Sequence, residues 1–220
     1  VATERAPFSR ILWAKPGPVS CELSEMTIDQ LINQFEAGDV LVLNNTKVLK
    51  RRVFTSSGLE ILFLKPVGDG MSDGTSKLDW EVLCPSSRWK RNTRETLPEG
   101  IELEIVKRGR PQIVRAFRGN QQVELSDSYF EKHGEMPLPP YIQKARGERH
   151  NRQLDDLQYQ TVWAEQPGSL AAPTASLHFS AEHLEKLRNR GVQVLTITLH
   201  VGLGTFLPIT VEDLNEHQMH

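Results

Sequence analysis

The strongest constraint on the fold is a change of periodicity along the 220 residues of the chain. Between about residues 55 and 130 there is little helical periodicity, and short strand-like segments follow one another with glycine-rich or charged turns between them. In IELEIV, Ile101, Leu103 and Ile105 alternate with two glutamates, which is the pattern of a half-buried strand. Several such strands at near-regular spacing favour a small barrel. The segments are LEILFLK, LDWEVLC, IELEIV, PQIVRAF and QQVELS.

Both ends of the chain instead show a helix followed by a strand. In the N-terminal part, Thr27 and Gln30 have capping-box spacing, and the apolar run VLVLN after Gly38 predicts a buried strand. In the C-terminal part, Ser180 predicts a helix start and Gly191 its end, and the run VQVLTITLHVG follows. That run is nearly apolar on both faces, which favours an interior strand of a sheet covered by helices.

The simplest fold class that joins these patterns is an α/β domain built from both ends of the chain, with a small antiparallel β-barrel inserted into it. We place the α/β domain at residues 1–54 and 146–220, and the barrel at residues 55–145.

Composition narrows the class of protein. No apolar run approaches the roughly 18–20 residues that a membrane helix needs, and no signal-peptide segment opens the chain. Cys21 and Cys84 are isolated, which argues against a disulfide framework or a cysteine-based zinc site and favours the cytoplasm. The chain begins with Val1 and stops at His220 within an amphipathic segment, so we expect residues missing at both ends.

The net charge of −2 conceals a strong segregation of charge. Residues 47–52 carry four basic and no acidic side chains, and residues 88–118 carry nine basic against four acidic. Such windows can create a local positive field that binds phosphates, or they can form a solvated face without a partner.

Four stretches are more specific than packing requires. They are GDVLVLNNTKV (38–48), MPLPPYI (136–142), YQTVWAEQPGSLAAPTASLHF (159–179) and HVGLGTFLPI (200–209). The first ends a strand in polar residues, where the crevice of an open α/β sheet binds ligands. The second predicts a rigid extended segment that lines a groove, and the glycines of the last let backbone approach a ligand closely.

Taken in this order, the four stretches resemble the S-adenosylmethionine:tRNA ribosyltransferase-isomerase family of queuosine biosynthesis. The resemblance spans roughly residues 5–220 and implies an α/β domain with an inserted β-barrel. The chain departs from the family pattern at 49–51, at Ser176 and at Leu207, and the family continues well past His220.

The resemblance implies transfer and isomerisation of the ribosyl group of S-adenosylmethionine onto the aminomethyl group of a 7-deazaguanine base at the tRNA wobble position. The products would be epoxyqueuosine-tRNA, adenine and methionine. The implied partners are tRNA and S-adenosylmethionine, with no membrane, and we expect a monomer. S-adenosylmethionine would be consumed as a substrate, so no cofactor and no metal are expected.

The reaction needs a neutral amine and a base for the ribose carbon beside the sulfonium, and histidine suits both roles near neutral pH. The candidate catalytic residues are His178, His200 and His220. In GSLAAPTASLHFS, small residues would let a nucleoside lie against backbone, and His178 would arrive at the start of a helix.

The four stretches also supply the expected binding residues. Those for substrate are Asn45, Thr46, Lys47, Pro139, Tyr141, Tyr159, Gln160, Thr161, Ala172, Pro173, Thr174, Phe179, Gly202, Gly204, Thr205 and Phe206. Those for tRNA, from the basic windows, are Lys50, Arg51, Arg52, Arg88, Lys90, Arg91 and Arg94.

Two other functions stay open. One is a non-catalytic RNA-binding module whose barrel binds tRNA while the α/β part is a scaffold. The other is a metallohydrolase that uses His200, His217 and His220 as ligands.

Overall fold

The computed structural model describes residues 10–18, 20–68, 78–85, 88–89, 92–202, 204 and 211–216. The chain divides into two compact units. The first unit comprises Val1–Val48 and Pro140–Val201, and the second comprises Leu49–Pro139 and Gly202–His220. The sequence placed residues 202–220 with the α/β domain, whereas the described residues of this range, 202, 204 and 211–216, group with the second unit.

The second unit is built on one antiparallel sheet. Its strands are β5 (Arg52–Phe54), β6 (Glu60–Pro66), β7 (Trp80–Leu83), β8 (Glu95–Leu97), β9 (Ile101–Lys107), β10 (Gln112–Arg118) and β11 (Gln121–Gln122). They run in the order β5-β6-β7-β10-β9-β8, and β11 pairs with β10. The backbone N–H of Ser56, just after β5, donates to the carbonyl of Thr96 in β8 at 2.8 Å. The two edges therefore meet, and the sheet nearly closes into the barrel that the sequence predicted.

The interior of the barrel follows from the alternation of its strands. Ile101 and Leu103 of β9 and Val114 and Ala116 of β10 are buried, with polar residues between them. Helix α2 (Asp127–His133) begins at the Ser126 cap and adds Phe130 to this core. A 3-10 turn at Pro98–Gly100 joins β8 to β9, and a second at Leu214–Glu216 also belongs to this unit.

One strand lies in a different domain from the one predicted. The sequence assigned Arg52–Phe54 to the α/β domain, but these residues form β5, paired antiparallel with β6. Val53 is completely buried in the barrel core, so the apolar contacts of β5 decide where it belongs.

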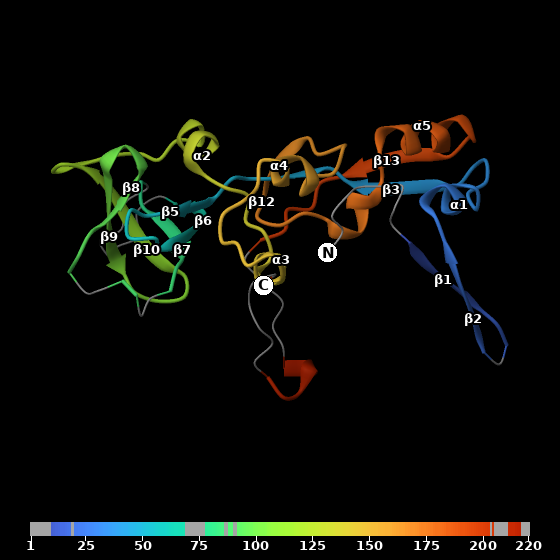
Figure 1. Cartoon of the computed structure of the whole chain (residues 1–220), viewed down its shortest axis with the longest axis horizontal. Coiled ribbons are helices and arrows are strands. Elements are labelled where there is room, and N and C mark those ends of the chain that lie inside the picture. Colours follow the sequence, from blue (N-terminus) through green and yellow to red (C-terminus); the bar gives the residue numbers. More distant parts are fainter. Residues whose placement is uncertain are drawn as a thin grey trace. The chain divides into compact units, whose positions relative to one another are not determined.

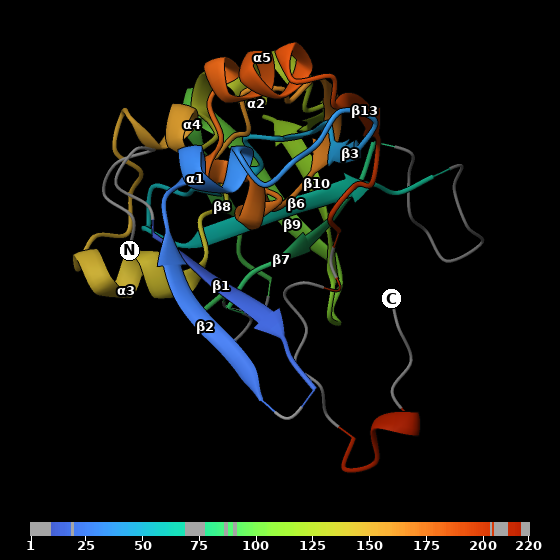
Figure 2. The ribbon, with the colours of Figure 1, turned by 90° about the vertical axis from the view of Figure 1, so that its right-hand side faces the viewer.

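The first unit contains short strand pairs and short helices. The strands are β1 (Ile11–Pro16), β2 (Cys21–Met26), β3 (Val40–Asn44), β4 (Thr46–Val48), β12 (Gln166–Ser169) and β13 (Gln193–Ile197). β3 pairs with β13 and β4 with β12, both in parallel, whereas β1 and β2 form an antiparallel hairpin (Figure 2). The helices are α1 (Ile28–Ile32), α3 (Pro140–Arg146), α4 (Asp155–Gln158) and α5 (Ala181–Asn189), with a 3-10 helix at Thr174–His178.

The predicted helix starts are confirmed. Thr27 forms a reciprocal capping box with Gln30, and Ser180 forms one with His183 at the start of α5. Gly191 follows the end of α5 with a φ of 84°, as expected for a glycine that stops a helix. Helix α1 ends at Ile32, so Gly38 lies beyond it and does not terminate it.

The parallel pair β3–β13 presents two different faces. On one face, Leu41, Leu43 and Val194 pack with apolar residues of α1 and α5, which lie beside these strands in Figure 1. On the other face, Val42 and Leu195 are each 51% exposed. The sequence predicted a strand covered on both faces, and within the described residues only one face of β13 is covered.

The proline-rich stretch 136–142 is also corrected by the structure. The sequence predicted an extended segment, whereas Pro140 begins helix α3 and Tyr141 lies within it. Proline is compatible with the first turn of a helix because the N–H that it lacks has no partner there.

Candidate functional site

Polar residues at the point where β3 passes into β4 connect the two parallel strand pairs. The side-chain oxygen Oδ1 of Asn44 accepts from the backbone N–H groups of Thr46 (3.2 Å) and Leu199 (3.0 Å). Its Nδ2 donates to the carbonyl of Leu199 at 2.9 Å. Asn44 therefore fastens the segment after β13 to the start of β4. It is absent from the predicted site residues, although the motif that contains it was singled out.

Asn45 was predicted to bind substrate, but its amide makes contacts within the protein. Oδ1 accepts from Oγ1 of Thr198 at 2.6 Å, and Nδ2 donates to Oε2 of Glu165 at 3.3 Å. Asn45 is only 6% exposed. These contacts support the same strand ends that Asn44 joins.

Beside these asparagines, two buried hydroxyl groups meet a histidine. Oγ1 of Thr46 lies 2.8 Å from Oγ of Ser169 and 2.8 Å from Nδ1 of His200. Ser169 also accepts the backbone N–H of Val201 at 2.8 Å. Thr46 and Ser169 are completely buried, whereas His200 is exposed. We call Thr46, Ser169 and His200 the histidine cluster.

A glycine sets the position of the imidazole ring. A Cβ added at Gly168 would lie 2.5 Å from Cε1 of His200 and 2.6 Å from its Nδ1. Because real side chains do not approach so closely, only glycine leaves room for the ring beside the end of β12. Gly168 and Ser169 lie in the stretch 159–179 but were not predicted as site residues.

The side chains of the predicted residues 159–161 are mostly buried in the first unit or hydrogen-bonded within it. Burial raises the pKa of Tyr159 to about 12, and a hydrogen bond with the backbone of Ala172 opposes this rise. The amide of Gln160 pairs with both backbone groups of Val48, at 3.1 Å and 2.8 Å. The buried Oγ1 of Thr161 has no hydrogen-bond partner in the part of the chain that the structure describes.

His178 ends the 3-10 helix Thr174–His178, two residues before the Ser180 cap of α5. Its position just before a helix agrees with the prediction. The ring of Phe179 lies 6.3 Å from that of Trp163, in an edge-on packing contact. Within the same stretch, Ala172 is buried, Pro173 is half-buried and Thr174 is exposed.

The remaining predicted substrate residues are more scattered. Lys47, Tyr141 and Gly202 are exposed, and Pro139 is half-buried. Gly204 is described and exposed. The predicted residues Thr205, Phe206 and His220 lie outside the described residues, as does His217.

Two arginines predicted to bind tRNA are instead buried. Arg51 is 8% exposed, pairs with Asp127 at 2.7 Å, and lies over the ring of Phe130 at 4.3 Å. Arg52 is 1% exposed and pairs with Glu135 at 2.8 Å. These guanidinium groups contact neighbouring carboxylates and rings, which favours structural roles within the second unit.

The other basic candidates differ in accessibility. Arg88 is exposed, and Lys50 is half-buried, 4.0 Å from Glu131. Arg94 is exposed but forms ion pairs with Glu102 at 3.0 Å and Glu104 at 3.3 Å. Lys90 and Arg91 lie outside the described residues.

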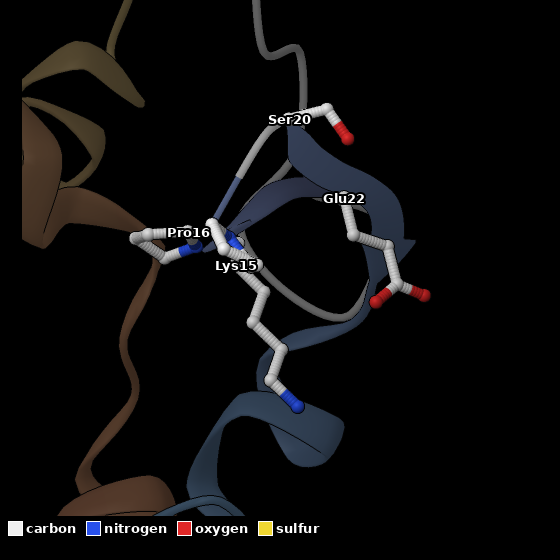
Figure 3. Close-up of a pocket in the computed structure, with 6 residues that line it drawn as sticks. Lys15, Pro16, Ser20 and Glu22 are labelled. Carbon is white, nitrogen blue, oxygen red and sulfur yellow. The ribbon is translucent and has the colours of Figure 1, made fainter.

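A hollow of about 440 Å³ lies at the turn of the β1–β2 hairpin. Figure 3 shows the side chains of Lys15 and Glu22 extending from the two strands, with Ser20 at the turn. Its lining residues are all exposed, and none is a predicted site residue. The histidine cluster therefore remains the better candidate for a functional site.

The described residues contain neither a metal-binding group nor a membrane-spanning helix. Among them, no group of three or more His, Cys, Asp or Glu side chains could hold a metal ion. No helix in the same part of the chain is long and apolar enough to cross a membrane.

Comparisons with known proteins place the chain among related sequences. The family described as "Queuosine biosynthesis protein" matches residues 2–220. A relative from Trichlorobacter lovleyi, named S-adenosylmethionine:tRNA ribosyltransferase-isomerase, is 37% identical over 203 residues, which are 90% of this chain and 55% of the relative. A relative of the same name from Geobacter metallireducens is 39% identical over 203 residues, 90% of this chain and 56% of the relative.

Among solved structures, a similar chain is S-adenosylmethionine tRNA ribosyltransferase from Thermotoga maritima. It is 24% identical, with a TM-score of 0.29, covering 82% of this chain and 47% of that one. The chain thus spans about half the length of the curated relatives that it matches.

Proposed function

Because this chain belongs to the queuosine biosynthesis protein family, we propose that it carries the S-adenosylmethionine:tRNA ribosyltransferase-isomerase activity named for its relatives. The substrates are S-adenosylmethionine and a tRNA with 7-aminomethyl-7-deazaguanine at the wobble position. The ribosyl group is transferred and isomerised, and the products are epoxyqueuosine-tRNA, adenine and methionine. S-adenosylmethionine is consumed, and no separate cofactor takes part.

One observation supports this proposal beyond the sequence match. Thr46, Ser169 and His200 come from three of the four distinctive stretches, and the hydroxyl of Thr46 lies within hydrogen-bonding distance of the other two side chains. Strand packing alone does not require a buried pair of hydroxyl groups bonded to an exposed imidazole. Such a cluster can position a polar group for a ligand at the strand ends.

The proposed ribosyl transfer requires the removal of two protons. The attacking amine must be neutral, although a free alkylammonium has a pKa of about 10.4. The ribose carbon beside the sulfonium must also lose a proton, which the positive sulfur makes more acidic. A histidine is suited to either step near neutral pH, and His178, His200 and His220 are the candidates for this base.

The tRNA would meet the basic windows. Arg88, Lys90 and Arg91 are the main candidates, with Lys50 and Arg94 as further contacts. Phosphates attract such side chains without regard to base sequence. The wobble base itself must reach the strand ends of the first unit.

A single-turnover assay tests the function. The chain is mixed with S-adenosylmethionine and tRNA that carries the precursor base, and adenine and modified tRNA are measured by chromatography. Adenine release that depends on the modified tRNA supports the proposal. Binding of tRNA with no adenine release would favour the RNA-binding module, and activity that requires an added metal ion would favour the metallohydrolase.

A further inference from the structure

A continuous series of hydrogen bonds leads from the backbone to the His200 ring. The N–H of Val201 donates to Ser169, Oγ of Ser169 lies 2.8 Å from Oγ1 of Thr46, and Oγ1 of Thr46 lies 2.8 Å from Nδ1 of His200. Thr46 and Ser169 are completely buried. Their hydroxyl hydrogens therefore cannot turn to bulk water and need acceptors inside the protein.

Counting hydrogens determines the direction of this series. In the part of the chain that the structure describes, two contacts can take the hydroxyl hydrogens of Thr46 and Ser169: the one between the two hydroxyl oxygens and the one between Thr46 and Nδ1 of His200. If Nδ1 carried a hydrogen and donated it to Thr46, both hydroxyl hydrogens would compete for the one contact between Thr46 and Ser169. One buried hydrogen would then have no acceptor, which is unfavourable.

The opposite arrangement satisfies every group. Oγ of Ser169 accepts the N–H of Val201 and donates its hydrogen to Oγ1 of Thr46. The hydroxyl of Thr46 then donates to an unprotonated Nδ1 of His200. We infer that neutral His200 is held as the Nε2–H tautomer, with Thr46 as the positioning residue and the Nε2–H of this exposed residue as a hydrogen-bond donor to a ligand. Hydrogen bonds that run in one direction also polarise one another, which strengthens the series.

This assignment changes the role of His200. Its Nε2 already carries a hydrogen, so it donates a hydrogen bond and does not act as the general base. The identity of the ligand atom rests on the proposed function. When adenine leaves, it takes the electron pair of the bond to ribose, and its ring nitrogens gain negative charge. A fixed N–H directed at such a nitrogen stabilises the departing base in the transition state.

Nitrogen NMR of the chain with ¹⁵N-labelled histidine tests the tautomer directly. Spectra are recorded at alkaline pH, where imidazoles are neutral, and the His200 signals are identified by their loss in His200→Gln. We expect a protonated Nε2 and an unprotonated Nδ1. A protonated Nδ1, or signals averaged between the two tautomers, would overturn the inference.

Variants of Thr46 and Ser169 separate the roles of the two hydroxyl groups. Thr46→Val removes the hydroxyl at similar volume and should release His200 into averaged tautomers, whereas Thr46→Ser should keep the wild-type pattern. Ser169→Ala is the matched control, because Thr46 then has His200 as its remaining acceptor and the tautomer should persist. A wild-type spectrum in Thr46→Val, with folding checked by circular dichroism, would exclude the role of Thr46.

The donor role is tested by adenine release. His200→Gln keeps an N–H donor but cannot act as a base, and His200→Ala has neither property. We expect the Gln variant to retain about tenfold more activity than the Ala variant, as one hydrogen bond would contribute. Equal losses would reject the donor role. If the wild-type chain releases no adenine, the proposed function fails, while the NMR result still decides the tautomer.

Discussion

The hydroxyl oxygen of Thr46 lies 2.8 Å from Nδ1 of His200, although 154 positions of sequence separate the two residues. The contact exists because β13 runs parallel to β3, so the chain leaves β13 beside the place where β3 passes into β4. The position of His200 therefore depends on strand register and on the small residues around the ring.

Replacement of Gly168 by alanine should displace the His200 ring. The new Cβ would lie 2.5 Å from Cε1 of the imidazole, and a misplacement of about 1 Å can reduce the rate of an enzyme about 100-fold. We expect a loss of adenine release of about that size, measured under single turnover. Gly68→Ala is the control, because nothing lies within 4 Å of its added Cβ. Full activity in Gly168→Ala would show that the ring position is unimportant.

His178→Gln tests the general base. Glutamine keeps a polar side chain but cannot accept a proton near neutral pH. If His178 is the base, turnover should fall by about 100-fold or more, while S-adenosylmethionine binding by calorimetry and the melting temperature stay near wild type. If the melting temperature falls instead and the folded fraction keeps its activity, then His178 has a structural role and His220 is the next candidate.

The basic windows should determine the salt dependence of tRNA binding. Replacing Arg88, Lys90 and Arg91 together by glutamine should weaken binding and flatten the plot of log affinity against log salt. Each lost phosphate contact should reduce its slope by about 0.7–0.9, because fewer counterions are released. Binding is measured by filter retention or fluorescence at several salt concentrations.

The control for that variant removes charge elsewhere. Lys15→Gln changes an exposed lysine outside both basic windows and should leave the slope unchanged. Arg94→Gln should have a smaller effect than Arg88→Gln, because Glu102 and Glu104 already pair with Arg94. An unchanged slope in the triple variant would place the tRNA on another surface.

Replacement of Arg52 should reduce the stability of the folded protein rather than weaken tRNA binding alone. Its guanidinium group is buried and lies 2.8 Å from Glu135. In Arg52→Met, Glu135 loses this partner, and we expect the free energy of unfolding to fall by about 3 kcal/mol or more. Urea unfolding measures this loss, and the double variant with Glu135→Gln should recover part of it. A stable Arg52→Met protein with weakened tRNA binding would contradict the structural assignment.

The two cysteines should react at very different rates. Burial raises the pKa of the Cys84 thiol to about 11, and the thiolate is the reactive form. At pH 8, roughly one Cys84 in a thousand is then ionised, and its alkylation rate should rise about tenfold per pH unit until the pH approaches that pKa. Cys21 is exposed and should react first. Alkylation of Cys21→Ser and Cys84→Ser, followed by mass spectrometry, measures each rate, and equal rates would refute the prediction.

The sequence by itself determined the features that depend on near neighbours. The capping boxes at Thr27 and Ser180 each require a partner only three residues away, so their spacing predicts them. The alternation in Ile101–Lys107 likewise predicted a barrel strand with one buried face. The four distinctive stretches identified the family, because the order and identity of residues are retained whatever their positions in space.

Only the tertiary structure decided which side chains are buried and which meet. KVLKRR gives no sign that Arg51 lies over Phe130, or that Arg52 pairs with Glu135, because both partners lie more than 75 positions away. The prolines of 136–142 predicted an extended segment, yet Pro140 fits the first turn of α3. The apolar pattern of β13 likewise could not show that one face lies open. Burial and distance depend on residues remote in sequence, and these place His200 against Thr46 and Ser169.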